Sequence, residues 1–227
     1  MKAIVGLGNP GKKFEKTRHN VGFLVIENLK LKIENFSDWE NNKKLLSEIS
    51  EGEIANQKII LIKPQAFMNN SGKSVKMLNT KYKIQDTNLF VIHDDIDIPL
   101  GKIRISKGRS SAGHKGIESI IKELGTKNFV RFRIGIKPEK GDEDKSSSSP
   151  AELPVMEAKV KMGTKSPSPF AIARVIENRK QKTEKFVLEK FSEEEEKILK
   201  EVIKKTVDAI EMAINERAEK AMNKYNK

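Results

Sequence analysis

Short apolar runs alternate with amphipathic stretches in the first part of the chain, and this alternation restricts the fold more than any other feature. Lys2–Gly6 (KAIVG), Lys58–Lys63 (KIILIK) and Leu89–His93 (LFVIH) are rich in branched apolar residues and predict buried strands. Asn20–Lys32 and Ser71–Asn79 instead repeat their apolar residues at helical spacing. Strands that alternate with helices predict an α/β fold, which we expect to be a single three-layer domain with a mixed central sheet flanked by helices.

Further elements complete this region. Lys102–Ser106 alternates apolar and polar residues as a strand does, after a turn at Pro99–Gly101. His114–Leu124 has apolar residues at helical spacing, and Gly125 follows it as a C-cap. The mixed and charged stretch Ser37–Gln57 predicts a hairpin or a loop before the second apolar run.

Basic residues concentrate near the end of this region. The chain has a formal net charge of +12, and Gly101–Lys137 alone holds ten basic residues against two acidic ones. Val130–Ile136 (VRFRIGI) alternates apolar and basic residues, so its apolar side chains should face the core and Arg131 and Arg133 should face away. A local basic excess favours a surface that binds a polyanion, although charge alone is equally compatible with a solvated lysine-rich surface.

The composition changes after residue 138. Glu139–Pro169 is rich in serine and proline and has little apolar surface, so it predicts a mobile excursion. Phe170–Asn178 fits a short helix, and Phe186–Leu188 predicts a last strand. Ser192 and Glu195 form a capping box that begins a long helix. We therefore expect one domain over residues 1–227, with a surface insertion at about 139–185 and a C-terminal helix at about 192–222.

Two absences exclude several classes of function. The chain has no cysteine, which excludes disulfides, thiolate zinc sites and a cysteine nucleophile, and favours a reducing compartment. No apolar run approaches the roughly 18 residues of a membrane-spanning helix, and the first residues predict a strand instead of a signal peptide. We therefore expect a cytoplasmic protein with no membrane partner.

A glycine-rich turn follows the first strand. The glycines of Gly6-Leu-Gly8-Asn-Pro-Gly11 have the spacing of the dinucleotide-binding fingerprint. The context does not fit, because Pro10 leads into a basic loop and the next strand begins only near residue 58, without the acidic residue that binds a ribose. The glycines therefore predict a tight turn and not a nucleotide site.

Polar residues at the strand ends offer two kinds of chemistry. The acidic run His93–Asp97 (HDDID) would suit a divalent cation, but the other strand ends add no carboxylate. His19 and Asp94 both follow strand ends, and a histidine bound to a carboxylate can accept a proton from water. Asn9 and Asn69 lie at comparable positions and offer amides to a carbonyl oxygen or a water. The alternative that these residues only form caps and turns stays open.

The motif series of bacterial peptidyl-tRNA hydrolases resembles six segments of this chain, which occur in order: GLGNPG, TRHNVG, KPQAFMNNSG, VIHDDIDIPLG, AGHKG and RFRIGI. The six segments cover about residues 1–138, and FVLEKFS with the helix after it extends the resemblance. Six motifs in a fixed order are far more specific than any one of them.

This resemblance implies hydrolysis of the ester that joins a peptide to the 3′ ribose of tRNA, which recycles tRNA released from stalled ribosomes. Carried over by motif, His19 would be the general base that activates water, and Asp94 would orient it. Asn69 would position the water or the peptide main chain, and Asn9 would hold the substrate near the scissile carbonyl. The resemblance also implies a monomeric α/β domain that needs no metal, nucleotide or other cofactor.

The resemblance further implies a substrate-binding set of basic and aromatic residues: Arg104, Arg133, Phe14, Phe67 and Lys115. The two arginines would contact the tRNA 5′ phosphate and acceptor stem. Three features depart from the family pattern. Phe14 stands where tyrosine is common, Lys115 stands where many members have asparagine, and the span of 139–185 exceeds the usual short connection.

Two other functions remain as alternatives. A noncatalytic protein that binds tRNA or rRNA would use the same basic surface and would never hydrolyse an ester. A metal-dependent nuclease would use the acidic run, would cut phosphodiesters and would be silenced by a chelator.

Overall fold

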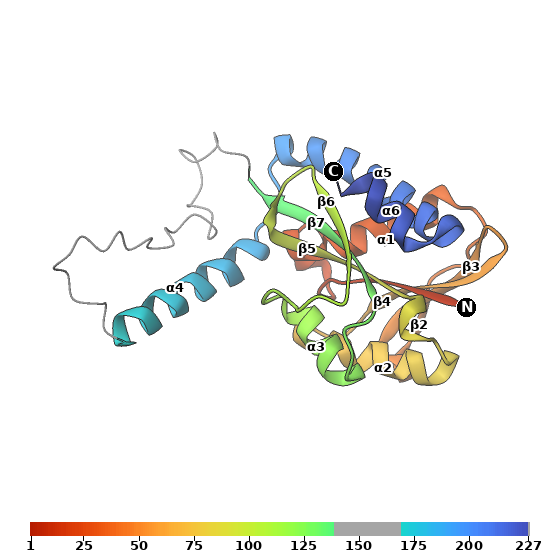
Figure 1. The fold of residues 1–227 in the computed structure, drawn as a ribbon, viewed down its shortest axis with the longest axis horizontal. Helices are drawn as coiled ribbons and strands as arrows, with labels where there is room; N and C mark the ends of the chain where they lie inside the picture. Colours follow the sequence, from red (N-terminus) through yellow and green to blue (C-terminus); the bar gives the residue numbers. More distant parts are fainter. Residues whose placement is uncertain (139–168, 227) are drawn as a thin grey trace.

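The computed structural model of the chain describes residues 1–138 and 169–226, and its centre is a seven-stranded mixed sheet (Figure 1). The strands lie in the order β2-β3-β4-β1-β5-β7-β6. β4, β1, β5 and β7 are parallel to one another, and the outer strands pair in the antiparallel sense. The strands are β1 (Lys2–Gly6), β2 (Glu40–Asn42), β3 (Ser47–Ile54), β4 (Gln57–Pro64), β5 (Leu89–Pro99), β6 (Ile103–Lys107) and β7 (Val130–Lys137).

Helices cover both faces of this sheet. The described helices are α1 (Val21–Lys32), α2 (Ser71–Tyr82), α3 (Lys115–Leu124), α4 (Pro169–Val187), α5 (Glu193–Glu216) and α6 (Ala218–Tyr225). α1, α5 and α6 pack on one face, and α2 and α3 pack on the other. α4 extends away from the sheet (Figure 1). The described chain therefore has the predicted three layers, with a mixed sheet between helices.

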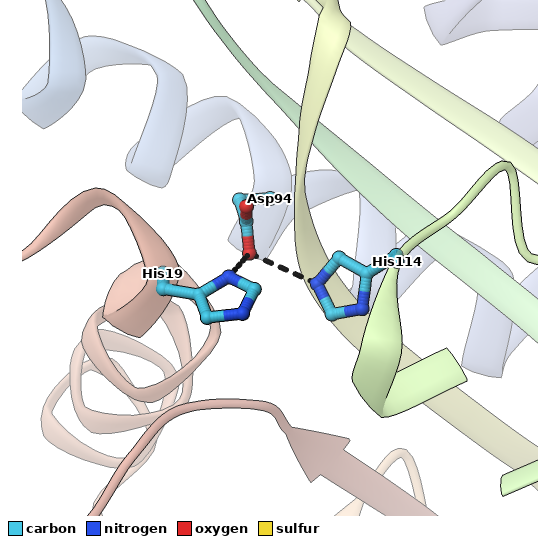
Figure 2. A group of neighbouring side chains, drawn as sticks. All are labelled: His19, Asp94 and His114. Carbon is cyan, nitrogen blue, oxygen red and sulfur yellow. Dashed lines mark hydrogen bonds and ion pairs between the residues drawn. The ribbon is translucent and has the colours of Figure 1, made fainter. Parts of the chain in front are cut away.

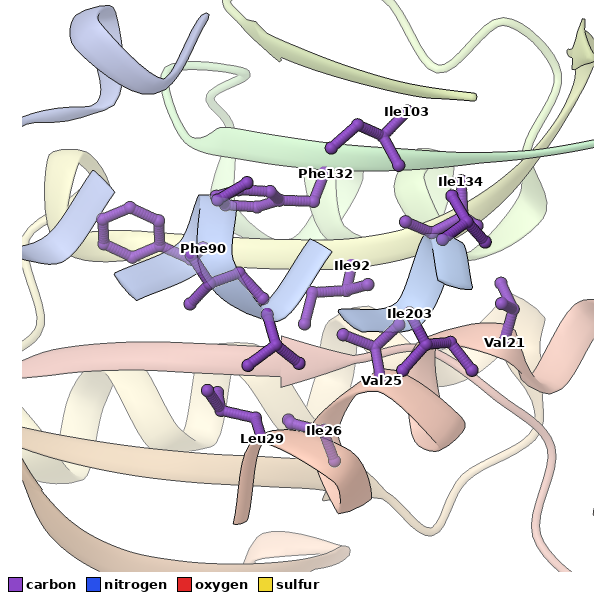
Figure 3. Close-up of a cluster of buried hydrophobic side chains, with 14 of the residues drawn as sticks. Val21, Val25, Ile26, Leu29, Phe90, Ile92, Ile103, Phe132, Ile134 and Ile203 are labelled. Atoms are coloured by element: carbon purple, nitrogen blue, oxygen red, sulfur yellow. The ribbon is translucent and has the colours of Figure 1, made fainter. Parts of the chain in front are cut away.

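Alternation along the central strands explains why both faces are covered. In β1, Ile4 belongs to the core under α1 and α5, whereas Ala3 and Val5 belong to the core under α2 and α3. In β5, Phe90 and Ile92 point into the first of these cores (Figure 3). Strands buried on both faces are apolar at nearly every position, which is how these runs could be recognised in the sequence.

β5 is longer than predicted. The strand was expected over Leu89–His93, but it continues to Pro99, so the acidic run lies within the strand and not after it. Its pairing with β7 passes through Asp94 and Asp95 and then shifts register before Pro99. The strands approach closely there, because a Cβ on Gly135 would lie 1.9 Å from Pro99 O. The strand is extended by its pairing with β7, which cannot be seen in the apolar pattern of β5 alone.

The prediction of a last strand at Phe186–Leu188 is wrong. Phe186 and Val187 complete α4 and are buried in the core shared with α1 and α5. A single isolated β-bridge forms nearby among the described residues, between Lys190 and Thr17. Helix–helix packing, and not sheet pairing, therefore buries these apolar residues.

The other helical predictions differ in extent. The helix expected over Phe170–Asn178 belongs to the longer α4. The capping box at Ser192 is confirmed, and α5 ends at Glu216, because Arg217 with a φ of 93° separates it from α6. The predicted excursion over 139–169 lies outside the described residues except for Pro169, and the surface insertion stays a prediction. None of the helices in the described ranges combines the length and apolarity needed to cross a bilayer.

Candidate active site

The segment between β1 and α1 carries His19 to the side of β5. The segment ends in a short 3-10 turn, η2 (Arg18–Asn20), which leads directly into α1. α1 begins in contact with the strands, because a Cβ on Gly22 would lie 2.4 Å from Leu7 N and 2.5 Å from Ile92 O. Only glycine permits so close an approach, and the approach holds His19 against the strand.

Asp94 lies between two imidazoles (Figure 2). His19 Nδ1 is 2.8 Å and His114 Nε2 is 3.0 Å from the same oxygen, Asp94 Oδ1. The three side chains come from η2, from β5 and from the residue before α3. Each is about nine-tenths buried or more, with side-chain exposures of 10%, 3% and 9% for His19, Asp94 and His114.

The environment of Asp94 decides which nitrogens carry protons. Burial by itself would raise the pKa of Asp94, but the facing imidazoles and their hydrogen bonds hold that pKa well below its usual range. Because the carboxylate carries no proton, both facing nitrogens must be N–H donors. His114 Nδ1 accepts a hydrogen bond from Ile117 N (3.3 Å), which caps α3. In its neutral form His19 therefore presents Nε2 as a proton acceptor.

The third histidine of the chain, His93, is buried behind His114. His93 Nδ1 donates to the backbone oxygen of Asp94 (2.7 Å), and its ring meets the ring of His114 edge-on at 4.6 Å. Burial, reinforced by the neighbouring His114, lowers the pKa of His93 well below its ordinary value. His93 is therefore a neutral packing group behind His114.

Asn9 is fixed beside the histidine turn by two partners. Its backbone N–H donates to Asn20 Oδ1 and its backbone oxygen accepts from Asn20 Nδ2, both at 2.9 Å. Its own Oδ1 accepts from Met68 N at 2.8 Å. The amide nitrogen of Asn9 is therefore the part left to meet a ligand. Asn69 is exposed in the neighbouring 3-10 turn η4 (Met68–Asn70).

Two phenylalanines meet near these turns. The rings of Phe14 and Phe67 pack edge-to-face with centroids 6.5 Å apart, and Phe67 is 58% exposed. Lys13 Nζ lies 4.7 Å from the centre of the Phe14 ring. Exposed aromatic rings beside a cation offer a surface on which a base or an apolar side chain can stack.

A cavity of about 550 Å³ opens at the histidine pair. His19, Asp94 and His114 line it on one side, and α4 lines the other. Lys115 also lines it, and its Nζ binds Glu184 Oε1 of α4 at 2.7 Å. That hydrogen bond lowers the pKa of the Glu184 carboxyl. Lys115 thus joins the start of α3 to α4.

A second cavity, of about 340 Å³, is lined by four arginines: Arg104, Arg109, Arg131 and Arg133. Ala112 lines both cavities, so the two are neighbours. Arg133 Nε donates to Asp95 Oδ2 at 2.8 Å. Arg131 faces away from the apolar core as predicted, but it is buried and not exposed, and Ser110 O in the loop before α3 accepts its Nη1 hydrogen. Burial, and then repulsion by Arg133, lowers the pKa of Arg131 to about 10.

The described residues bring six of the sequence candidates together in three pairs. His19 and Asp94 meet as the histidine–carboxylate hypothesis requires, and Phe14 meets Phe67. Arg104 and Arg133 lie in the neighbouring basic cavity, away from the pair. The sequence analysis did not predict His114 as a site residue, although it lies in the AGHKG motif; the expected helix began at His114, whereas α3 begins at Lys115 and His114 is its N-cap.

The acidic run does not converge on a cation. Asp94 binds the two histidines, whereas Asp95 binds Arg133 and accepts a hydrogen bond from Asp97 N. Among the described residues, His19, Asp94 and His114 could place ligand atoms within 4.8 Å of one another. A metal held there would have to replace both N–H···O bonds, so the donor set fits hydrogen bonding better than metal ligation.

Comparisons of the sequence and the fold with known proteins show the family of this chain. The family model described as peptidyl-tRNA hydrolase matches residues 3–149 and 158–227. The peptidyl-tRNA hydrolases of Aquifex aeolicus and Thermodesulfovibrio yellowstonii are each 39% identical to this chain, covering all of it and 97% and 100% of their own lengths. A crystal structure of peptidyl-tRNA hydrolase from Acinetobacter baumannii matches with a TM-score of 0.75 and 28% identity, covering 100% of this chain and 94% of that one. This chain belongs to the peptidyl-tRNA hydrolase family.

Proposed function

We propose that this chain, an enzyme of the peptidyl-tRNA hydrolase family, hydrolyses the ester between a peptide and the 3′ ribose of tRNA, with His19 as the general base. The substrate is that of the family, and the residue roles rest on the site itself. The observation that carries these roles is the pair of hydrogen bonds on Asp94 Oδ1, which leaves His19 Nε2 as an acceptor at the mouth of a cavity.

The reaction follows from this protonation state. His19 Nε2 takes a proton from water as the water oxygen attacks the ester carbonyl, and Asp94 stabilises the imidazolium that forms. The amide nitrogen of Asn9 donates to the substrate beside the scissile carbonyl. When the carbon–oxygen bond to the ribose breaks, the imidazolium returns its proton to the ribose oxygen. The products are a free peptide carboxylic acid and a tRNA with an intact 3′ hydroxyl.

Binding of the tRNA is assigned to the basic and aromatic groups around this centre. The basic cavity that Arg104 and Arg133 line suits a phosphate of the acceptor stem, because guanidinium groups bind phosphate oxygens strongly. Phe14 and Phe67 offer a stacking surface for the unpaired 3′ end or the peptide. Lys115 contributes a positive charge at the edge of the cavity, and Asn69 adds an amide near the Asn9 turn.

The test is release of N-acetylated amino acid from N-acetylaminoacyl-tRNA by the wild-type protein, measured with and without a chelator. We expect the ester to be cleaved at the same rate in both conditions, and the recovered tRNA to keep its full length. A protein that binds tRNA without releasing the amino acid would contradict the proposal and favour a noncatalytic RNA-binding protein. Shortened tRNA, formed only without chelator, would favour a metal-dependent nuclease.

A further inference from the structure

The histidine turn is attached to the start of α5 through its neighbour, Arg18. Nη1 and Nη2 of Arg18 donate to the two carboxylate oxygens of Glu195 at 2.9 Å and 2.8 Å. Both side chains are largely buried, with exposures of 7% and 12%. A bidentate pair fixes the orientation of both groups as well as their distance, because two parallel hydrogen bonds forbid rotation.

Two aromatic rings enclose the same guanidinium. The central carbon of Arg18 lies 4.5 Å from the centre of the Phe186 ring and 4.9 Å from that of Phe191. Phe186 belongs to the last turns of α4, and Phe191 lies in the connection to α5. The backbone of this connection also accepts the Arg18 N–H, at Glu189 O (3.0 Å). Arg18 is therefore held by charge, by ring contacts and by the main chain.

Glu195 is itself immobilised by the helix that it begins. Its Oε2 accepts the backbone N–H of Ser192 at 2.8 Å, as the second half of the capping box. The carboxylate that binds Arg18 thus also belongs to the N-terminal capping box of α5, a 24-residue helix packed on the sheet. The backbone N–H of Ser192 thus holds the Glu195 carboxylate in place for Arg18.

His19 directly follows Arg18 in the same 3-10 turn, η2. On its other side Asn20 is bound to Asn9, so the turn is held at both ends. We infer that Arg18 and Glu195 are positioning residues, whose buried ion pair sets the place of His19 relative to Asp94. This inference rests on the proposed role of His19 as the base. A displacement of catalytic groups by about 1 Å can cost on the order of 100-fold in rate, so a fixed turn matters to turnover.

Two substitutions and one control test the inference. Arg18→Lys keeps the positive charge but loses the two parallel hydrogen bonds of the guanidinium. Glu195→Gln keeps the shape of the side chain but replaces one acceptor with a donor. Ser192→Ala is the control, because it removes the hydroxyl of the capping box and leaves the backbone N–H and the Arg18–Glu195 pair in place. We expect both pair variants to lower kcat by about ten-fold or more with little change in KM, and the control to keep kcat.

A second readout reports His19 without relying on turnover. With 15N-labelled histidine, the three imidazoles of the chain can be followed by NMR, and the Nδ1 proton of His19 should give a downfield signal from its bond to Asp94. We expect this signal to weaken or disappear in both pair variants and to persist in the Ser192→Ala protein. It tests the inference even if the wild-type protein proves inactive on tRNA.

Pair variants with normal kcat and an unchanged His19 signal would overturn the inference and leave Arg18 as a structural anchor only. Equal losses in the control would also overturn it, since they would show general loosening of α5. If Arg18→Lys does not fold, Glu195→Gln decides the question by the same two measurements.

Discussion

Asp94 uses one oxygen for two histidines, and this has a consequence for its replacement. Because both N–H groups point at Oδ1, an asparagine with its carbonyl in that place could keep both hydrogen bonds and lose only the charge. In the proposed reaction we expect the negative charge to stabilise the imidazolium during proton transfer and the hydrogen bonds to orient the ring. The two contributions of Asp94 are therefore separable by substitution.

We predict that Asp94→Asn lowers kcat by about five- to 30-fold, because a hydrogen bond to a charged group contributes about 1–2 kcal/mol more than a neutral one. Asp94→Ala should lower kcat further, because both rings then lose their partner. Steady-state hydrolysis of N-acetylaminoacyl-tRNA measures both rates. A fully active asparagine variant would show that the charge has no role in the reaction.

The same substitution changes the dependence of stability on pH. The pKa of Asp94 is held below its ordinary value of 3.8, so as pH falls below about 4 the unfolded state binds a proton that the folded state does not. This contribution to stability is present above that pH and is lost as pH falls. The free energy of unfolding of Asp94→Asn should therefore decrease less steeply in acid than that of the wild-type protein, as measured by denaturant titration. Parallel curves would contradict the assigned state of Asp94.

At the scale of elements, the site depends on how α3 begins. His114 caps this helix through Nδ1 and binds Asp94 through Nε2, so one ring serves both the helix and the carboxylate. Gly72 allows α2 to lie directly against α3, since a Cβ there would lie 2.1 Å from Ser119 O. His114, which binds the Asp94 carboxylate, is therefore positioned in part by the packing of two helices on the sheet.

His114→Asn and His114→Ala should separate these two roles. Asparagine is a good N-cap but is too short to reach Asp94, whereas alanine does neither. We predict that both variants lose about ten-fold in kcat, and that the alanine variant loses about 1 kcal/mol more unfolding free energy than the asparagine variant. Thermal unfolding and hydrolysis rates measured on the same samples check this. Full activity in the asparagine variant would mean that the contact with Asp94 is dispensable.

The elements with strong local signals could be predicted, and those fixed by distant contacts could not. β1, β4 and α5 have apolar patterns or a capping box that determine them locally. The extension of β5 depends on its register with β7, and the fate of Phe186–Leu188 depends on packing between α4 and α5. Both outcomes involve partners far along the chain, which a pattern within one segment does not report.

The site shows the same division. His19 and Asp94 could be proposed because both follow the predicted ends of strands in an α/β sheet, where ligands usually bind. The roles of His114 and Arg18 depend on contacts 20 and 177 residues away along the chain. No motif spacing predicts which of these side chains share a partner, so those roles required the packed structure.

At the scale of the molecule, the cavity lined by His19, Asp94 and His114 adjoins the cavity lined by the four arginines. Asp94 and Asp95 are adjacent in β5, and the first serves the histidines while the second holds Arg133. Both aspartates line the first cavity, and the bond from Asp95 to Arg133 links that cavity to the basic one beside it. A tRNA end that is bound at its phosphates can in this way present its ester beside His19.

We predict that Arg104→Gln raises KM for tRNA several-fold with little change in kcat, because one phosphate contact is lost. The slope of log affinity against log salt should decrease by about one. Lys58→Gln is the matched control, since it also removes one exposed positive charge but lies at the start of β4, at the opposite end of the strand from the Asn69 turn. Equal salt slopes in the two variants would show that Arg104 makes no specific phosphate contact.

The central claim, that His19 is the base, is tested most directly by single-turnover hydrolysis with saturating His19→Ala protein and N-acetylaminoacyl-tRNA. The predicted result is a rate about 100- to 10,000-fold below the wild-type rate, with unchanged affinity for the tRNA, because a general base typically contributes a factor of that size. A His19→Ala protein that binds the tRNA and cleaves the ester at the wild-type rate would contradict the account.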